Sequence, residues 1–556
     1  MPKPTLLVFC LLCLVPPIAR AEEPAPAPAA AGDAVTAQVP KRSPFVLRIS
    51  SLERVDAMAK QVTPVLKSFG LEREMAPIEL LGASGFLFQM SGLDAALVDR
   101  SKPIYVALAG KEDPHLILHP AAGASWEGEK ELQHGMAAAL RGGAIVCRGP
   151  RGRDAEARGT PTSIALEGDL VVHVYLGDLV AGKKEEIEQG AAQAVMEAGA
   201  SPMLPDAAKA LMLPVVSGLK DAVFSLESFE YAVTLKEDRI ESEGLLKAKP
   251  RSNLRELFQR AGAPGRTDDL MGYLPKNGVL YADSVVESSW PGQEVATLVD
   301  QAVGEGTGQA LSSILGATAM FADHLSGRSA TAVSIGGMMM GVNACTIAEV
   351  KEGVDLNAII EKLDLTAANE ALNKVGIPLS STIQKSIAKH GETTLHRMSQ
   401  QSENPILAMQ LAMMQTYLAV EGPYLVTVTS PTAEDDIRGL LDKIRTGKPD
   451  DQHPHTLAMA RLGRAHNVGF TLNVGALKPM AMMLPMFLPI PGVQDVVNHL
   501  PDELSFSTAI DFSGGDLHWR GDWPSKKIVK MAQALRAAEV EREKERAAPA
   551  EEEDFD

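Results

Sequence analysis

The sequence predicts an α+β protein of two related modules, each a mostly antiparallel sheet with helices packed on one face. Three observations lead to this prediction. Apolar and polar residues alternate in many short segments, such as 104–108 and 506–510, as in strands with one buried face. The same order of segments recurs in both halves of the chain, and the composition of the two ends differs from that of the middle.

The first 21 residues have the three zones of a secretory signal peptide. Lys3 supplies a positive start, residues 6–15 form an unbroken apolar run of 10 residues, and Ala19-Arg20-Ala21 offers a small-x-small cleavage pattern. Such a run is too short to span a bilayer, which needs about 20 residues. We therefore expect cleavage after residue 21 and a mature protein that is periplasmic or secreted.

The composition of both ends of the mature chain predicts little packed structure there. Residues 22–44 are rich in Ala and Pro and predict a disordered spacer, whereas residues 539–556 carry nine acids and three bases and predict an acidic tail. The roughly 500 residues between them exceed what one hydrophobic core organises. We expect modules at 45–265 and 266–538, joined through the turn-rich stretch AGAPGRTD.

An internal duplication is predicted from three pairs of segments that share an order of strands, turns and helices. The pairs are 45–62 with 279–303, 168–189 with 466–484, and 224–258 with 504–535. In the last pair Gly514-Gly515 predicts a hairpin turn, and Pro524 predicts the start of a helix.

The second module contains an insertion at about 355–420 that the sequence predicts to be mostly helical. Its apolar residues recur at helical spacing. They are Ile359, Ile360, Leu363 and Leu365, followed later by Leu407, Leu411, Met414 and Leu418.

Composition excludes several classes of partner. The formal charge is −18, and loss of Lys3 and Arg20 with the signal peptide makes it −20, so no basic surface for nucleic acid or anionic lipid is expected. The most apolar later stretch, 480–493, is 14 residues long and contains three prolines, so no transmembrane segment is expected in the mature chain. Only Cys147 and Cys345 remain after cleavage, which excludes a disulfide framework.

Three histidines near the C-terminus are the candidate metal ligands. His453 and His455 follow Asp450 and Asp451, and His466 comes eleven residues after His455. Zinc accepts imidazole and carboxylate ligands, and a catalytic zinc site needs three of them. The alternative interpretation of the same residues is a solvated, Pro- and Asp-rich loop.

A Met-rich segment near the C-terminus is the candidate ligand or partner surface. Methionine fills irregular cores and also lines surfaces that accept varied partners. The residues that would form an apolar lip are Met480, Met483, Met486, Phe487 and Ile490.

The sequence contains no nucleophile elbow, no dinucleotide-binding glycine pattern and no phosphate-binding loop. We therefore expect an exported, soluble, non-enzymatic cell-envelope protein that acts as a binding or scaffolding module and needs no cofactor. Its partner would be an envelope protein or an apolar ligand, with no role for nucleic acid. Two alternatives stay open: a metal-dependent hydrolase around His453, His455 and His466, and a carrier of a lipid-like ligand.

Overall fold

The structure is a computed structural model of the 556-residue chain. It describes residues 38–39, 43–68, 84–85, 88–89, 91–109, 113–149, 164–200, 206–287, 320–336, 341–374, 379–403, 408–409, 411–412, 414–463, 465–478 and 499–547. The predicted signal peptide, most of the predicted spacer and the Met-rich segment lie outside these residues.

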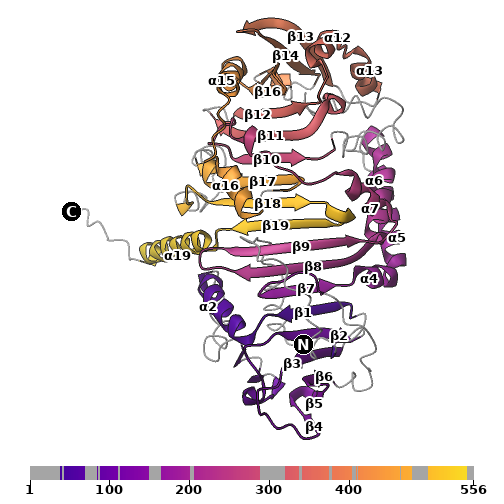
Figure 1. Cartoon of the computed structure of the whole chain (residues 1–556), viewed down its shortest axis with the longest axis vertical. Coiled ribbons are helices and arrows are strands. Elements are labelled where there is room, and N and C mark those ends of the chain that lie inside the picture. Colours follow the sequence, from indigo (N-terminus) through magenta and orange to yellow (C-terminus); the bar gives the residue numbers. More distant parts are fainter. Residues whose placement is uncertain are drawn as a thin grey trace, which may run out of the picture.

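The fold is a mixed α+β fold, as predicted, and is built on one large antiparallel sheet. Its 19 described strands form a continuous, stacked array (Figure 1). In spatial order these are β4 (Glu129–Glu131), β5 (Ala137–Arg141), β6 (Ala144–Arg148), β3 (Asp113–Leu118), β2 (Ile104–Ala109), β1 (Phe45–Ile49), β7 (Leu170–Val174), β8 (Leu226–Leu235), β9 (Ile240–Ala248), β19 (Leu517–Trp523), β18 (Ser505–Asp511), β17 (Val468–Asn473), β10 (Leu280–Val285), β11 (Leu325–Gly336), β12 (Gly341–Val350), β16 (Tyr424–Ser430), β15 (Gln415–Glu421), β14 (Thr393–Ser402) and β13 (Leu379–His390).

The two halves of the chain meet where β9 pairs with β19. This seam runs from Ile240 opposite Trp523 to Leu246 opposite Leu517. Outward from the seam, both halves have the same order of pairing: a hairpin partner (β8 or β18), then β7 or β17, then β1 or β10. The three pairs of segments that share an order of strands, turns and helices contain these strands.

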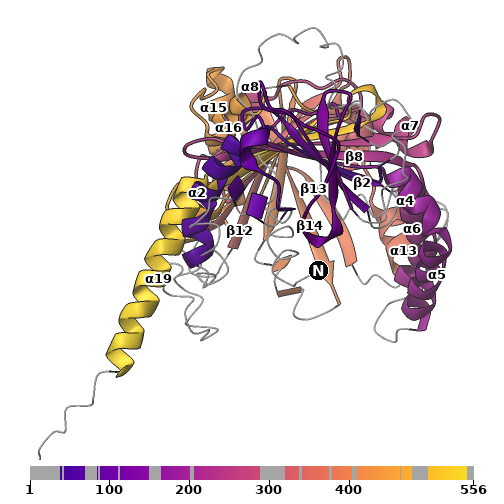
Figure 2. The same ribbon diagram turned by 90° about the horizontal axis from the view of Figure 1, so that it is seen from below.

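The sheet is arched, and most of its helices lie on the convex side or beside the ends of the strands (Figure 2). The described helices are α2 (Leu52–Ser68), α4 (Leu176–Gly182), α5 (Lys184–Ala200), α6 (Asp206–Phe224), α7 (Asn253–Arg260), α8 (Asp268–Met271), α12 (Leu356–Lys362), α13 (Thr366–Lys374), α15 (Ala433–Thr446), α16 (Pro454–Arg461) and α19 (Ser525–Ala547). Helices α8, α15 and α16 cover the convex side, whereas α2 and α19 flank one end of the strands and α4 to α6 flank the other.

Helices cover both faces of the sheet in the second half, so the prediction of helices on one face is wrong there. On one face of β16, Val426 packs in a cluster with Leu441 of α15. On the other face, the neighbouring Leu425 packs with Leu356 and Ile360 of α12. Because successive strand residues point to opposite faces, an apolar run such as that of β16 requires cover on both sides.

The predicted helical insertion is only partly helical. Helices α12 and α13 are present, but β13, β14 and β15 follow them. Ile359 and Ile360 lie in α12, and Leu363 is the residue that ends this helix, so the helical spacing is realised only there. Leu418 lies in β15, in the buried run Tyr417-Leu418-Ala419, where cross-strand pairing outweighs a chance helical spacing.

The boundaries predicted from composition differ from the packing at three places. Val39 is buried in a core cluster, so packed structure begins inside the predicted spacer. Helix α19 continues to Ala547, inside the predicted tail. Gly265 forms a β-bridge with His466 and Thr267 is buried, so the predicted linker packs against the second half.

Several local predictions are confirmed. Gly514 and Gly515 have positive φ angles in the turn between β18 and β19, and α19 begins directly after Pro524. The structure also shows what the sequence left open: Cys147 and Cys345 are free and buried in different core clusters.

Candidate functional site

Two of the three candidate histidines converge on one buried carboxylate. Nε2 of His455, on α16, lies 2.9 Å from Oδ1 of Asp283 on β10. Nε2 of His466, just before β17, lies 2.7 Å from Oδ2 of the same residue. The Thr267 hydroxyl also donates a hydrogen bond to Oδ2. All four side chains are buried.

A second line of hydrogen bonds extends this cluster into the sheet. His455 Nδ1 lies 2.8 Å from the Thr471 hydroxyl on β17, which lies 3.0 Å from the Ser507 hydroxyl on β18. The network therefore ties α16 to three adjacent strands.

His453 does not join the other two imidazoles. Its Nε2 lies 3.3 Å from the Pro275 carbonyl oxygen, and its ring packs edge-on against Tyr281 at a centroid distance of 4.8 Å. Burial lowers the pKa of His453 to about 4. Among the described residues no group of three or more His, Cys, Asp or Glu side chains is arranged to hold a metal ion. A carboxylate lies between His455 and His466, where a shared ion would have to bind.

The electrostatics of the cluster are those of a paired buried anion. Burial alone would raise the pKa of Asp283, but hydrogen bonds from His455 and His466 hold it far below its usual range. Gly469 gives the cluster its room, because a Cβ there would lie 2.1 Å from Asp283 Oδ1. The arrangement is a closed polar clamp that orders the strands.

The concave face of the arch has a composition that the sequence analysis missed. Ala509 of β18 packs against Met459 of α16 on the convex side. Successive strand residues point to opposite faces, so the residues on either side of Ala509 in β18, and those paired with them in the neighbouring strands, face the concavity. Over the eight consecutive strands from β1 to β10, the paired residues in that phase include no Asp, Glu, Lys, Arg or His. Glu227 of β8 is exposed and lies at the register shift between Leu226 and Ser228, outside these pairs.

Aromatic side chains are grouped on this concave face around the seam. The rings of Phe229 and Trp519 stack at 5.6 Å, and those of Phe506 and Trp523 meet edge-on at 4.7 Å. On β17, two strands from the seam strand β19, Phe470 is 40% exposed and Leu472 41% exposed.

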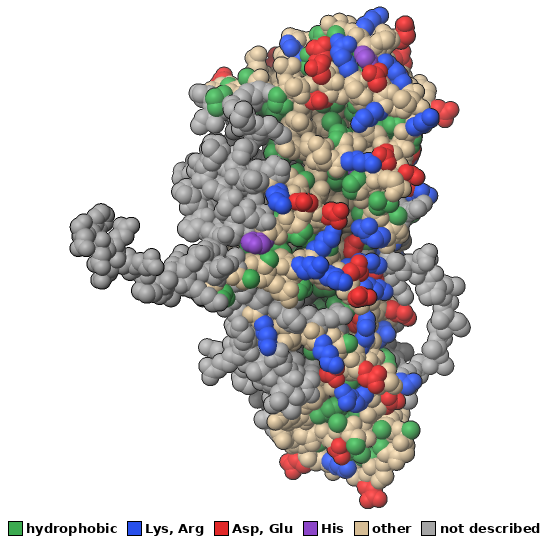
Figure 3. Space-filling model, turned by 90° about the vertical axis from the view of Figure 1, so that its left-hand side faces the viewer, with side chains coloured by type: hydrophobic (Ala, Val, Ile, Leu, Met, Phe, Trp, Pro, Cys, Tyr) green, Lys and Arg blue, Asp and Glu red, His purple; other side chains and the backbone are tan. Residues whose placement is uncertain are grey.

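The opposite face of the same eight strands carries the charged residues. These include Arg48, His173, Glu230, Glu241, Glu243, Lys247, Asp283, Asp511, His518, Arg520 and Asp522. Toward this convex side, at the right of Figure 3, basic and acidic side chains interleave on the surface. In β9 and β19 every charged residue falls in one phase, and this alternation is a sequence signal that indicates an uncharged face on each strand.

Helices beside the strand ends add further exposed apolar side chains. They are Leu179 of α4, Met196 of α5, and Leu213, Val215 and Leu219 of α6. Among the described residues no helix is both long and apolar enough to cross a bilayer. The other predicted apolar surface, formed by Met480, Met483, Met486, Phe487 and Ile490, lies outside the described residues.

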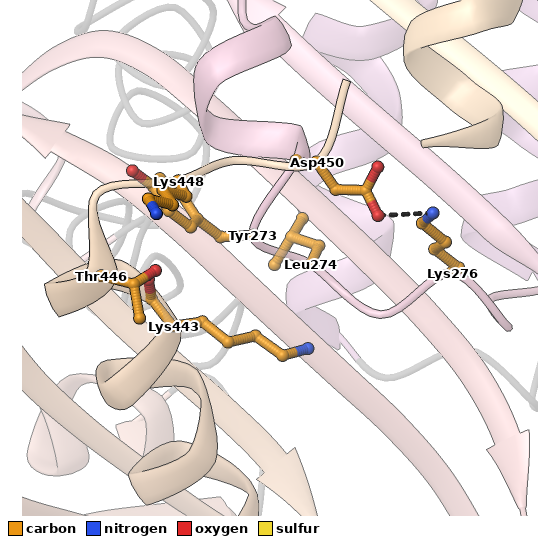
Figure 4. Close-up of a pocket in the computed structure, with 8 residues that line it drawn as sticks. Tyr273, Leu274, Lys276, Lys443, Thr446, Lys448 and Asp450 are labelled. Atoms are coloured by element: carbon orange, nitrogen blue, oxygen red, sulfur yellow. Dashed lines mark hydrogen bonds and ion pairs between the residues drawn. The ribbon is translucent and has the colours of Figure 1, made fainter. Parts of the chain in front are cut away.

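A separate cavity of about 480 Å³ lies between the end of α15 and the segment after α8 (Figure 4). Its lining includes three lysines and a single acidic residue. The lining residues are Gly272, Tyr273, Leu274, Lys276, Lys443, Thr446, Lys448 and Asp450.

Comparison with known proteins finds no family model, no curated protein and no solved structure that matches this chain.

Proposed function

We propose that this protein is an exported, non-enzymatic binding module of the cell envelope, and that its concave sheet face holds an apolar, uncharged ligand such as the acyl chains of a lipid. The observation that carries the proposal is the absence of charged side chains from the paired positions of that face across the eight strands from β1 to β10.

The chemistry of the concave face selects the class of ligand. Covering apolar surface yields about 25 cal/mol per Å² removed from water. A charged group placed against this face would lose its water and gain no ionic partner there, which is costly. The exposed Phe470 and Leu472 and the aromatic residues near the seam offer contact area without such a penalty.

The hydrogen bonds around Asp283 support a structural role for the histidines and weigh against a metal-dependent hydrolase at these residues. Nε2 of His455 and of His466 is already occupied by the carboxylate, and His453 contacts a backbone carbonyl instead.

We also infer that the two halves of the chain arose as related modules. The identical order of strand pairing outward from the β9–β19 seam supports this inference, as do the three pairs of similar segments. Two such modules joined edge to edge produce a binding face longer than either could form alone.

The binding proposal is tested with N-phenyl-1-naphthylamine, an uncharged apolar fluorophore whose emission increases on leaving water. We expect the full mature chain to bind it, and Phe470→Asp and Leu472→Asp to abolish most of the fluorescence increase. Leu457→Asp is the matched control, because Leu457 is also 41% exposed but lies on α16 at the convex side. Equal loss in the control, or no binding by the unaltered chain, would contradict the proposal.

Export is tested separately by N-terminal sequencing of the protein recovered from outside the cytoplasm. The proposal expects the mature chain to begin at Glu22. A chain recovered only from the cytoplasm with Met1 intact would contradict this part and leave the ligand proposal to its own experiment.

A further inference from the structure

The cavity at the end of α15 is formed by two chain segments that cross closely. One segment follows α8 and contributes Tyr273, Leu274 and Lys276; the other leaves α15 and contributes Lys448 and Asp450. The amide nitrogen of Asp450 donates a hydrogen bond to the Gly272 carbonyl oxygen at 3.0 Å, which fixes the crossing. Figure 4 shows the side chains of Lys276 and Lys443 on different sides of the hollow.

Two glycines make this arrangement possible. A Cβ on Gly272 would lie 2.7 Å from the Asp450 nitrogen, so no larger residue fits at the crossing without movement. Gly447 ends α15 in the left-handed conformation, with a φ of 61°, and turns the chain toward the cavity. The hollow is thus built by the backbone and does not depend on one side-chain rotamer.

The charges that line the cavity are unbalanced. Asp450 is the only acid among the lining residues, and it forms an ion pair with Lys276. In the described part of the chain no acidic side chain forms an ion pair with Lys443 or Lys448. The lining therefore carries three positive charges and one negative charge in a chain whose formal charge is −18.

We propose that this cavity binds a small phosphate-bearing anion, at a site separate from the concave face and independent of its function. Ammonium groups bind phosphate as point charges, and the two lysines without acidic partners provide them. The Tyr273 and Leu274 walls would contact the organic part of such a ligand. The volume of about 480 Å³ lies within the range of small-molecule sites.

Isothermal titration calorimetry with inorganic pyrophosphate at low ionic strength tests the proposal on the full mature chain. We expect Lys443→Gln with Lys448→Gln to weaken binding by about tenfold or more, because both positive charges are lost. Lys60→Gln with Lys102→Gln is the control, since these exposed lysines cause the same change in net charge far from the cavity. Equal weakening in both double variants would assign the effect to overall charge and overturn the proposal.

Asp450→Asn tests the same site in the opposite direction. The substitution removes the only negative charge of the lining but keeps an oxygen for the hydrogen bond from the Gln452 amide nitrogen, at 2.9 Å. We expect pyrophosphate to bind more tightly by a few fold, and added salt to weaken the binding. Unchanged affinity in this variant, or no heat of binding with the unaltered chain, would overturn the site.

Discussion

At the residue scale, the most consequential side chain is Asp283. It accepts hydrogen bonds from Thr267, His455 and His466, and all four groups are buried. A buried carboxylate with several donors is stable only while those donors remain in place. The packing of α16, of the segment before α8 and of the central strands therefore depends on the Asp283 side chain.

Asp283→Asn should destabilise the fold without a change in side-chain size. The amide NH2 would face a ring N–H, and the ionic character of the hydrogen bonds would be lost, at a cost of about 3 kcal/mol. Urea unfolding should show a lower midpoint for this variant than for Asp451→Asn, which alters an exposed residue. Equal midpoints would show that the clamp contributes nothing.

Gly469 and Gly439 should respond to alanine with opposite signs. At Gly469 the new Cβ would meet Asp283 Oδ1 at 2.1 Å, so thermal unfolding should occur at a lower temperature. At Gly439, inside α15, nothing lies within 4 Å, and the greater helix propensity of alanine should stabilise by up to about 1 kcal/mol. A Gly469→Ala variant as stable as the unaltered chain would disprove the close packing.

His518 should make stability depend on pH above neutrality. It lies on β19, with Nε2 2.7 Å from Glu243 Oε1 on β9 and Nδ1 3.5 Å from Asp511 Oδ2 on β18. Burial alone would lower its pKa, but the nearby carboxylates of Asp511 and Glu243 outweigh burial and raise the pKa to about 9.

The pKa of His518 in the folded state exceeds its unfolded value of about 6.5. The contribution of His518 to the free energy of unfolding is therefore complete below about pH 6.5. It decreases as pH rises and is lost above about pH 9, a change of up to about 3 kcal/mol. His518→Gln should reduce the difference between urea midpoints measured at pH 6.5 and 9, whereas His324→Gln should preserve it. An unchanged difference in His518→Gln would contradict this assignment.

At the element scale, the sequence predicted turns and helix starts better than the content of the insertion. Gly514-Gly515 and Pro524 act through their own backbone restrictions, so neighbours in sequence suffice to predict their effect. The strands β13 and β14 instead depend on pairing with each other and with β15, and this pairing does not appear in the spacing of apolar residues.

Helices α15 and α6 should differ in what a leucine contributes to stability. Leu441 of α15 is fully buried, so Leu441→Ala should cost about 2–5 kcal/mol in urea unfolding. Leu219 of α6 is 63% exposed, so Leu219→Ala should change stability by less than about 0.5 kcal/mol. A large loss in Leu219→Ala would show that α6 is covered in solution.

At the scale of the whole molecule, the candidate site could be predicted only in part. The sequence identified His455 and His466, but their partner Asp283 lies 172 and 183 residues away and carries no local motif. The concave face was missed because it is assembled from one phase of eight strands, and only their registers reveal that these phases lie on the same face of the sheet.

The seam between β9 and β19 has a consequence for how the halves could exist apart. The backbone pairing of β9 with β19, and the packing of Trp519 over Gly244, cover one strand edge of each half. A half produced alone would present that edge unpaired, and unpaired edges recruit other strands. The N-terminal half alone should therefore self-associate through β9, as a swapped dimer or an aggregate, and adding the C-terminal half should dissolve that association. The covalent link between the halves thus also serves as protection against mispairing.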